Sequence, residues 1–294
     1  MSRSAVAPVA TGDTTGARAE GQTAKRPRFY REILLIALCY SAYSLVRNLV
    51  PPNHTAALHR GHDILHLEGL LHLNVELSIN RLFTDVRWLG VGANYYYASL
   101  HFVVTIGVLV WLYLRHPERY VFYRRLIFAT TVLALIGFWL YPLAPPRMVP
   151  GFVDTVLTFH TGGLYESGAS PIASVSNQYA AMPSLHTGWS LWCAIAIADV
   201  TRPNRFRWLV YCYPVATVIV ILGTANHYLL DAIGGVVTLF AGYAATRTVR
   251  TIIPRLGPAA RIFSTDTGGT STAAWPVPTS SPGPAGGERG STAV

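Results

Sequence analysis

The chain reads HYLLDAIGGVVTLFAGYAATR at residues 227–247. A helix needs about 20 predominantly apolar residues to cross a bilayer, so this run predicts a transmembrane helix that begins with a histidine and an aspartate. Residues four apart lie on one face of a helix, and Asp231 can therefore accept a hydrogen bond from one ring nitrogen of His227. The other ring nitrogen is then free to attack, which is the arrangement of an oriented nucleophile.

A second histidine stands at the start of another apolar run, in Ala181-Met-Pro-Ser-Leu-His186. A histidine close to the first one could protonate a leaving group, so His186 is a candidate general acid and base. Ser184 opens the same predicted helix, where free backbone N–H groups and the helix dipole favour an anion. Ser184 is better suited to cap this helix or to bind phosphate than to act as a nucleophile, because the sequence indicates no base that would activate it.

Arg147 follows two prolines, which stiffen the chain after the third predicted span and hold the arginine near the membrane surface. Its fixed fork of N–H donors suits phosphate oxygens. An arginine here could instead extend toward lipid headgroups. His227 and Asp231 could likewise be a structural pair that joins two helices, so single residues leave these alternatives open.

The composition is that of a membrane protein. Of the 294 residues, 51% are hydrophobic and only 13% are charged, whereas soluble domains carry about 25% charged residues. The mean hydropathy is +0.33. The sequence therefore predicts an all-α, six-span transmembrane helical bundle. The predicted spans are residues 33–50, 95–114, 124–143, 183–200, 207–223 and 228–247.

The positions of the basic residues predict the orientation of the bundle. They gather before the first span, at 115–125, at 201–207 and from Arg247 onward, whereas Arg147 is the single basic residue of 144–182. By the positive-inside rule the basic segments are cytoplasmic. Both termini are then cytoplasmic, and the candidate residues lie on the extracytoplasmic face of the cell membrane. No arginine run alternates with aromatic residues in a polar segment, so nucleic acid is not an expected partner.

The two ends of the chain differ from its middle. Residues 1–28 and 256–294 are rich in Gly, Ser, Thr, Pro and Ala, and they are predicted to be disordered cytoplasmic tails. Residues 29–255 are predicted to form the membrane-embedded domain, with the candidate residues inside 139–235. The N-terminal tail lacks the apolar core of a cleavable secretion signal, so the first span is expected to act as the insertion signal. Lys25 is the one lysine among 23 basic residues, a preference typical of a GC-rich bacterial genome.

The segment 54–82 repeats apolar residues at helical spacing but is too polar to span a membrane. An amphipathic helix along the interface, broken at Gly61, is the predicted structure. Four of its histidines do not form the His-Glu-x-x-His pattern of a zinc site, so no metal is expected there. The three cysteines all fall inside predicted spans and provide no disulfide framework or metal motif. The four histidines are His59, His62, His66 and His72.

Three blocks of the sequence, together with the predicted six-span layout, resemble the type-2 phosphatidic acid phosphatase superfamily. The blocks are Tyr141-Pro-Leu-Ala-Pro-Pro-Arg147, Ala181-Met-Pro-Ser-Leu-His186 and Ala225-Asn-His-Tyr-Leu-Leu-Asp231. They resemble most closely the branch related to inositol phosphorylceramide synthase, which is an inositol phosphotransferase. The resemblance covers residues 130–245, and the blocks are specific in their order and spacing.

The resemblance implies a mechanism that needs no metal or other cofactor. His227 would attack phosphorus to form a phosphohistidine, Asp231 would orient His227, and His186 would serve as general acid and then as general base. Arg147, Ser184 and backbone N–H groups would hold the phosphate oxygens as charge develops on them.

The chain departs from the usual blocks of this superfamily at three places. Leu185 replaces the glycine of Pro-Ser-Gly-His, Trp139-Leu140 stands where a lysine is usual, and Ile221 stands where an arginine is usual. The phosphate would therefore have fewer cationic partners than in the usual site. Arg81, Arg87 or the co-reactant are candidates to supply the missing charge.

The expected function is that of a membrane lipid phosphatase or phosphotransferase acting on a lipid-linked phosphate, with membrane lipids around it. Water as the acceptor would make the protein a phosphatase, and an inositol or sugar hydroxyl would make it a transferase. Candidate substrates are phosphatidate, a polyprenyl phosphate or diphosphate, and a phosphoinositol lipid. A non-enzymatic lipid transporter or membrane scaffold, and a metal-dependent membrane hydrolase, remain alternatives.

Overall fold

A computed structural model of the chain describes residues 27–49, 53–161 and 178–252. The elements in these ranges are helices, and the β-structure among them is limited to an isolated bridge between Leu143 and Ala180. The predicted all-α class is thus confirmed. The predicted tails lie almost entirely outside the described residues, so their disorder stays a prediction.

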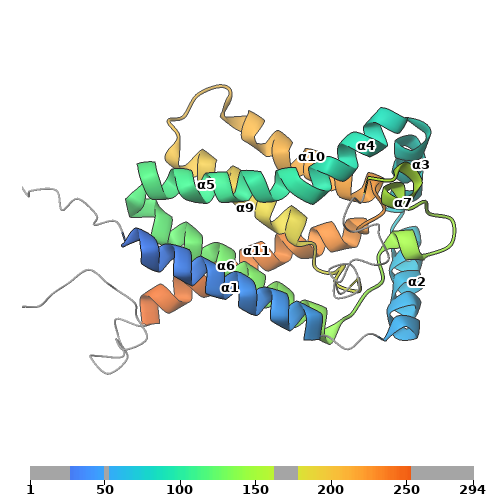
Figure 1. Cartoon of the computed structure of the whole chain (residues 1–294), viewed down its shortest axis with the longest axis horizontal. Coiled ribbons are helices and arrows are strands. Elements are labelled where there is room, and N and C mark those ends of the chain that lie inside the picture. Colours follow the sequence, from blue (N-terminus) through green and yellow to red (C-terminus); the bar gives the residue numbers. More distant parts are fainter. Residues whose placement is uncertain (1–26, 50–52, 162–177, 253–294) are drawn as a thin grey trace, which may run out of the picture.

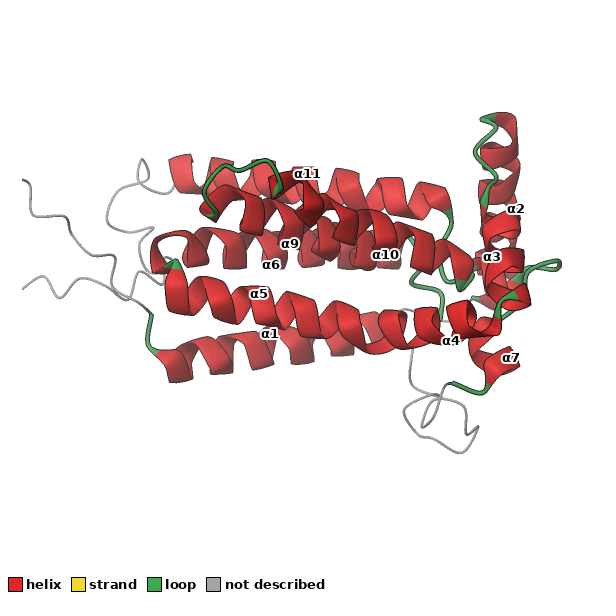
Figure 2. Ribbon diagram, turned by 90° about the horizontal axis from the view of Figure 1, so that it is seen from above, coloured by secondary structure: helices red, strands yellow, loops and turns green. Residues whose placement is uncertain are grey.

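The long helices lie side by side along the long axis of the molecule (Figure 1 and Figure 2). The main hydrophobic core forms between α5, α6, α9 and α11, where Leu112, Tyr120 and Trp192 are buried. Trp192 also donates its indole N–H to the backbone oxygen of Tyr123 at 3.0 Å, which joins α9 to α6. The long helices are α1 (Phe29–Leu49), α5 (His101–Arg115), α6 (Pro117–Leu140), α9 (Leu185–Val200), α10 (Cys212–Gly223) and α11 (Leu229–Ile252).

Among the residues that the structure describes, four helical segments are long and apolar enough to cross a membrane. They are residues 29–46 of α1, residues 87–115, α6, and residues 229–249 of α11. The second of these begins earlier than predicted, because α4 (Arg87–Tyr95) and a π-helical turn (Tyr96–Leu100) lead directly into α5. The remaining two predicted spans correspond to α9, which has 16 residues, and to a shorter apolar helix at residues 207–223. Six crossings therefore stay a prediction, although α9 and α10 pack within the same bundle.

Shorter helices gather at one end of the bundle, where α2 (His54–Leu70) crosses its axis and α3 (Glu76–Asp85) and α7 (Thr155–Phe159) lie beside it (Figure 1 and Figure 2). The predicted break at Gly61 is wrong, because α2 continues through this residue. A Cβ at Gly61 would lie 2.8 Å from the Tyr228 hydroxyl, so the glycine allows α2 to approach the start of α11 closely. The helix ends instead at residues 71–75, where His72 has a φ of 55°.

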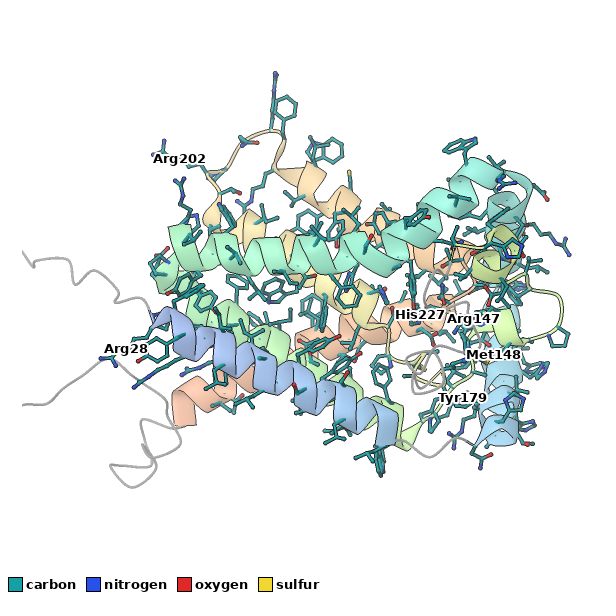
Figure 3. The ribbon with its side chains drawn as sticks, viewed as in Figure 1. Arg28, Arg147, Met148, Tyr179, Arg202 and His227 are labelled. Atoms are coloured by element: carbon teal, nitrogen blue, oxygen red, sulfur yellow. The ribbon has the colours of Figure 1, made fainter. Side chains whose placement is uncertain are left out.

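The two ends of the bundle differ in their polar residues. Arg28 and Arg202 lie at one end, whereas Arg147 and His227 lie at the other, next to α2 (Figure 3). The candidate residues are therefore separated from these two arginines by the length of the bundle.

Near the start of α1, a buried ion pair fastens this helix to α6. Arg124 contacts the carboxylate of Glu32, and Tyr120 donates its hydroxyl to the same carboxylate at 2.8 Å. These contacts satisfy a charged group that would be costly to bury alone, and they hold α1 at the edge of the bundle.

Candidate active site

His227 lies in the loop between α10 and α11, two residues before α11 begins at Leu229. Its side chain is buried, and its Nδ1 atom is 2.9 Å from the backbone oxygen of Ala181 and 3.4 Å from Oδ2 of Asp231. The predicted contact between His227 and Asp231 is therefore present. It is made across the start of the helix, because His227 itself is not yet helical.

The surroundings of His227 favour one tautomer of its neutral ring. Nδ1 faces two oxygen acceptors, so the proton of the neutral ring belongs on Nδ1 and the lone pair belongs on Nε2. Oδ2 of Asp231 also accepts the backbone N–H of Tyr228 at 3.0 Å, which fixes the carboxylate in turn. The Tyr228 hydroxyl donates to the backbone oxygen of Ala144 at 3.0 Å. The loop thus holds His227 with its Nε2 atom directed away from Asp231.

His186 comes from the first turn of α9, and its ring centroid is 5.7 Å from that of His227. The two histidines that the sequence places 41 residues apart are therefore neighbours, as their predicted roles require. The His186 ring stacks on Tyr97 at 4.2 Å and lies against His101 at 4.5 Å. Tyr97 and His101 were not predicted as site residues. They reach His186 from the π-helical turn and its C-terminal end, and such turns often occur at functional sites.

Ser184 is the N-cap of α9, as expected. Its Oγ atom accepts the backbone N–H of Thr187 at 3.4 Å, and its own N–H donates to the backbone oxygen of Asp231 at 2.9 Å. A Cβ at Gly235 would lie 2.3 Å from the Ser184 backbone oxygen, so only glycine allows this approach of α9 and α11. Ser184 therefore fixes the start of α9 beside the start of α11.

Arg147 lies in a short 3₁₀ turn, Pro146–Met148, and is held against the His227 loop (Figure 3). Its backbone N–H donates to the oxygen of Ala225 at 2.9 Å, and its guanidinium group donates to Oδ1 of Asn226. Nε of Arg147 is also 3.6 Å from Oδ2 of Asp154. Arg147 thus lies in the site as predicted, whereas Asn226 and Asp154 were missed, although each lies near a predicted residue in the sequence.

Other residues considered for the phosphate site lie elsewhere. Arg81 and Arg87 are exposed on α3 and at the start of α4. Trp139 is exposed near the end of α6. Ile221 is fully buried in a cluster with neighbouring apolar residues, so a side chain at this position packs in the core and does not face a phosphate.

Glu68 and Glu76 contact the start of α11. The sequence alone places them only in the polar part of segment 54–82. Glu76 accepts the backbone N–H of Leu229 at 2.8 Å, and Glu68 accepts the backbone N–H of Leu230 at 2.8 Å. Both carboxylates are buried. They belong to the layer that supports the His227 loop.

The sequence predicted no metal site at the histidines of α2. His59, His62 and His66 are exposed. Within residues 27–49, 53–161 and 178–252, no three His, Cys, Asp or Glu side chains gather in a way that could hold a metal ion.

Comparison with known proteins gives one match. The family model of the PAP2 superfamily, the type-2 phosphatidic acid phosphatases, matches residues 62–245. No curated protein and no solved structure matches the chain. The matched range contains all five predicted site residues together with Glu68 and Glu76.

Proposed function

Because this chain belongs to the PAP2 superfamily, we propose that it is an integral membrane enzyme that removes or transfers a lipid-linked phosphate through a phosphohistidine. The observation that carries this proposal is the setting of His227. Its Nδ1 atom is held by Ala181 and Asp231, and the ring of a second histidine lies 5.7 Å away. This leaves Nε2 as a nucleophile beside a group that can transfer protons.

The first half of the reaction forms the covalent intermediate. Nε2 of His227 attacks phosphorus, the bond from phosphorus to the leaving oxygen breaks, and His186 donates a proton to that oxygen. The His227 ring gains positive charge in this step, and Asp231, 3.4 Å from Nδ1, stabilises it.

The second half regenerates the enzyme. His186, which is now neutral, takes the proton of an acceptor hydroxyl, and the acceptor oxygen attacks phosphorus. The bond between phosphorus and Nε2 breaks, and both histidines return to their starting states. With a phosphomonoester as substrate, water as the acceptor gives free phosphate, whereas an alcohol gives a new phosphomonoester.

The phosphate oxygens would be held by Arg147 and by the first N–H groups of α9. A guanidinium group has five N–H donors in a fixed fork, so the contacts of Arg147 with Asn226 and Asp154 leave donors for a phosphate. Helix starts favour anions because their N–H groups lack partners within the helix. Ser184 contributes by fixing the start of α9.

The orientation of the enzyme follows from charge. Arg28 and Arg202 lie at the end of the bundle opposite His227 (Figure 3). Under the positive-inside rule that end is cytoplasmic, and the active site opens to the extracytoplasmic side of the cell membrane. This orientation agrees with six crossings and with both termini in the cytoplasm.

Transfer to an inositol or sugar hydroxyl is the second candidate reaction. It is favoured by the block around Ser184, where Leu185 replaces the usual glycine, as in the synthase-like branch. Leu185 is buried against Ala134 and Phe138 of α6. A non-enzymatic transporter or scaffold would use the same His227–Asp231 contact only to join the loop to α11.

The test is phosphate release and lipid-product analysis with purified protein, phospholipids and polyprenyl phosphates, in chelator, with and without inositol or sugar. We expect His227→Ala to lower turnover about a thousandfold or more while the protein stays folded. His62→Ala, at an exposed position of α2, is the matched control and should keep full turnover.

Each outcome decides between the candidates. Free phosphate as the product identifies a phosphatase, and a new phosphate ester that requires the added alcohol identifies a transferase. Activity that disappears in chelator would point to the metal-dependent hydrolase. Full turnover of His227→Ala, or its unfolding with no wild-type turnover on any substrate, would contradict the proposal.

A further inference from the structure

The start of α11 is contacted by three carboxylates from three parts of the chain. The consecutive backbone N–H groups of Tyr228, Leu229 and Leu230 donate to Asp231, Glu76 and Glu68 at 3.0, 2.8 and 2.8 Å. The N–H groups at a helix start have no partner inside the helix, and these side chains accept three of the four at the start of α11. They hold this backbone in place directly after His227.

The three carboxylates at the start of α11 would need a positive charge to balance them if all three were ionised. A helix start carries about half a positive elementary charge, which cannot balance three buried anions. Oε2 of Glu68 and Oε2 of Glu76 are buried and have no other hydrogen-bond donor among the described residues. Because the two side chains accept the N–H groups of consecutive residues, they lie close together, and Glu76 acts as a like charge on Glu68. Two carboxyl groups in this situation are satisfied when one proton lies between them.

We propose that Glu68 and Glu76 share one proton and that this pair, by capping α11, positions His227 for attack. The inference rests on the proposed function of His227. Glu68 and Glu76 are positioning residues, because they act through the backbone of residues 229–230 and touch no reacting atom. Their link to the nucleophile is short, since the capped residues directly follow His227 and Tyr228.

The groups around Glu68 and Glu76 predict the pH above which the pair loses its shared proton. Burial raises the pKa of Glu68 to about 8, and the carboxylates of Glu76 and Asp231 add to this effect, whereas the N–H of Leu230 opposes it. Tyr228, which directly precedes α11, lies near the pair and has its pKa raised by burial, and His227 contacts Asp231. Above about pH 8 the shared proton is lost, and the two carboxylates repel each other at the helix start.

The experiment compares Glu68→Gln with Glu68→Ala across about pH 6 to pH 10. A glutamine can accept the Leu230 N–H and donate to Glu76, as a protonated glutamate does, whereas alanine leaves both groups without a partner. We expect Glu68→Gln to retain at least about ten times the turnover of Glu68→Ala. The decline of turnover above about pH 8 should be smaller in Glu68→Gln than in the wild type. The part that remains reflects the loss of the proton that His186 must donate. Glu118→Gln, at an exposed carboxylate near the start of α6, is the matched control and should keep the wild-type profile.

A second measurement is independent of catalysis. A carboxyl group whose pKa is higher in the folded protein makes folding less favourable as pH rises from its ordinary pKa of 4.5 to about 8. The thermal unfolding midpoint of the wild type should therefore fall relative to that of Glu68→Gln over this range. A difference that does not change with pH would overturn the shared proton.

The two proposals can fail separately. If Glu68→Gln is as inactive as Glu68→Ala at every pH, or if its alkaline decline matches the wild type, the positioning role is wrong while His227 remains the nucleophile. If the wild type has no turnover that depends on His227, the proposed function fails, and the unfolding midpoints still test the pair.

Discussion

Asp231 makes both of its side-chain contacts through one oxygen, which serves His227 and the N–H of Tyr228. The other oxygen, Oδ1, is buried and has no hydrogen-bond partner among the described residues. This arrangement places the carboxylate where the imidazole would become positive during the proposed attack. The role of Asp231 can therefore be separated from simple packing by a change that keeps its shape and removes its charge.

For Asp231→Asn we expect turnover to fall about a hundredfold to ten-thousandfold, because the amide no longer stabilises the charged ring and can select its wrong tautomer. Turnover with the preferred lipid phosphate, measured beside the unfolding midpoint, checks this. Asp63→Asn is the matched control at an exposed aspartate of α2. Turnover of Asp231→Asn within a few-fold of the wild type would show that Asp231 only supports the loop.

At the scale of single residues, the sequence predicted the site residues that lie close to one another along the chain. His227 and Asp231 are four apart, and Ser184 is two residues from His186, so spacing alone brought them together. Glu68 and Glu76 could not be found in this way, because they lie 162 and 153 residues from the N–H groups that they accept. Contacts of this kind depend on how helices pack, and no periodicity within one segment encodes them.

At the scale of elements, the contact of α9 with α11 decides the geometry of the site. The backbone oxygen of Ser184 approaches Gly235, and Gly188 in turn approaches the backbone of Gly235. Small residues allow membrane helices to pack closely. This contact sets the distance between the helix that carries His186 and the helix that follows His227.

Gly235→Ala should therefore disturb both stability and turnover. The added Cβ would lie 2.3 Å from the Ser184 oxygen, and such overpacking destabilises proteins by about 1–3 kcal/mol. Thermal unfolding and turnover of the purified variant measure the effect. Gly107→Ala is the matched control, because a Cβ there meets no atom within 4 Å, and we expect it to be neutral or stabilising by up to about 1 kcal/mol. Equal behaviour of the two variants would contradict the importance of this contact.

The sequence predicted helices better than it predicted their ends. Apolar runs of membrane length located α1, α6 and α11, since burial in lipid needs little tertiary information. The start of the second span was missed because Gly90, Gly92 and Asn94 interrupt the apolar helical pattern, although the helix continues through them. Gly61 was taken as a break because glycine is a poor helix former, whereas its role is to admit the Tyr228 hydroxyl.

At the scale of the whole molecule, the two ends of the bundle have separate roles. One end contains Arg28 and Arg202, and a buried contact of Glu32 with Arg124 fastens α1 there. The other end contains His227, and Glu68 of α2 and Glu76 of α3 contact the backbone that follows it. The proposed reaction on lipid headgroups requires its polar residues at a membrane surface. His227 and Arg147 lie together at one end of the bundle, as this requires.

The central claim is that His227 becomes covalently phosphorylated. The most direct measurement is to mix the protein with a lipid phosphate labelled at phosphorus, quench in alkaline detergent, where phosphohistidine survives, and map the labelled peptide. We predict label on His227 in the wild type and in His62→Ala, and none in His227→Ala. Turnover without labelled histidine, or label that persists at another residue in His227→Ala, would contradict the mechanism.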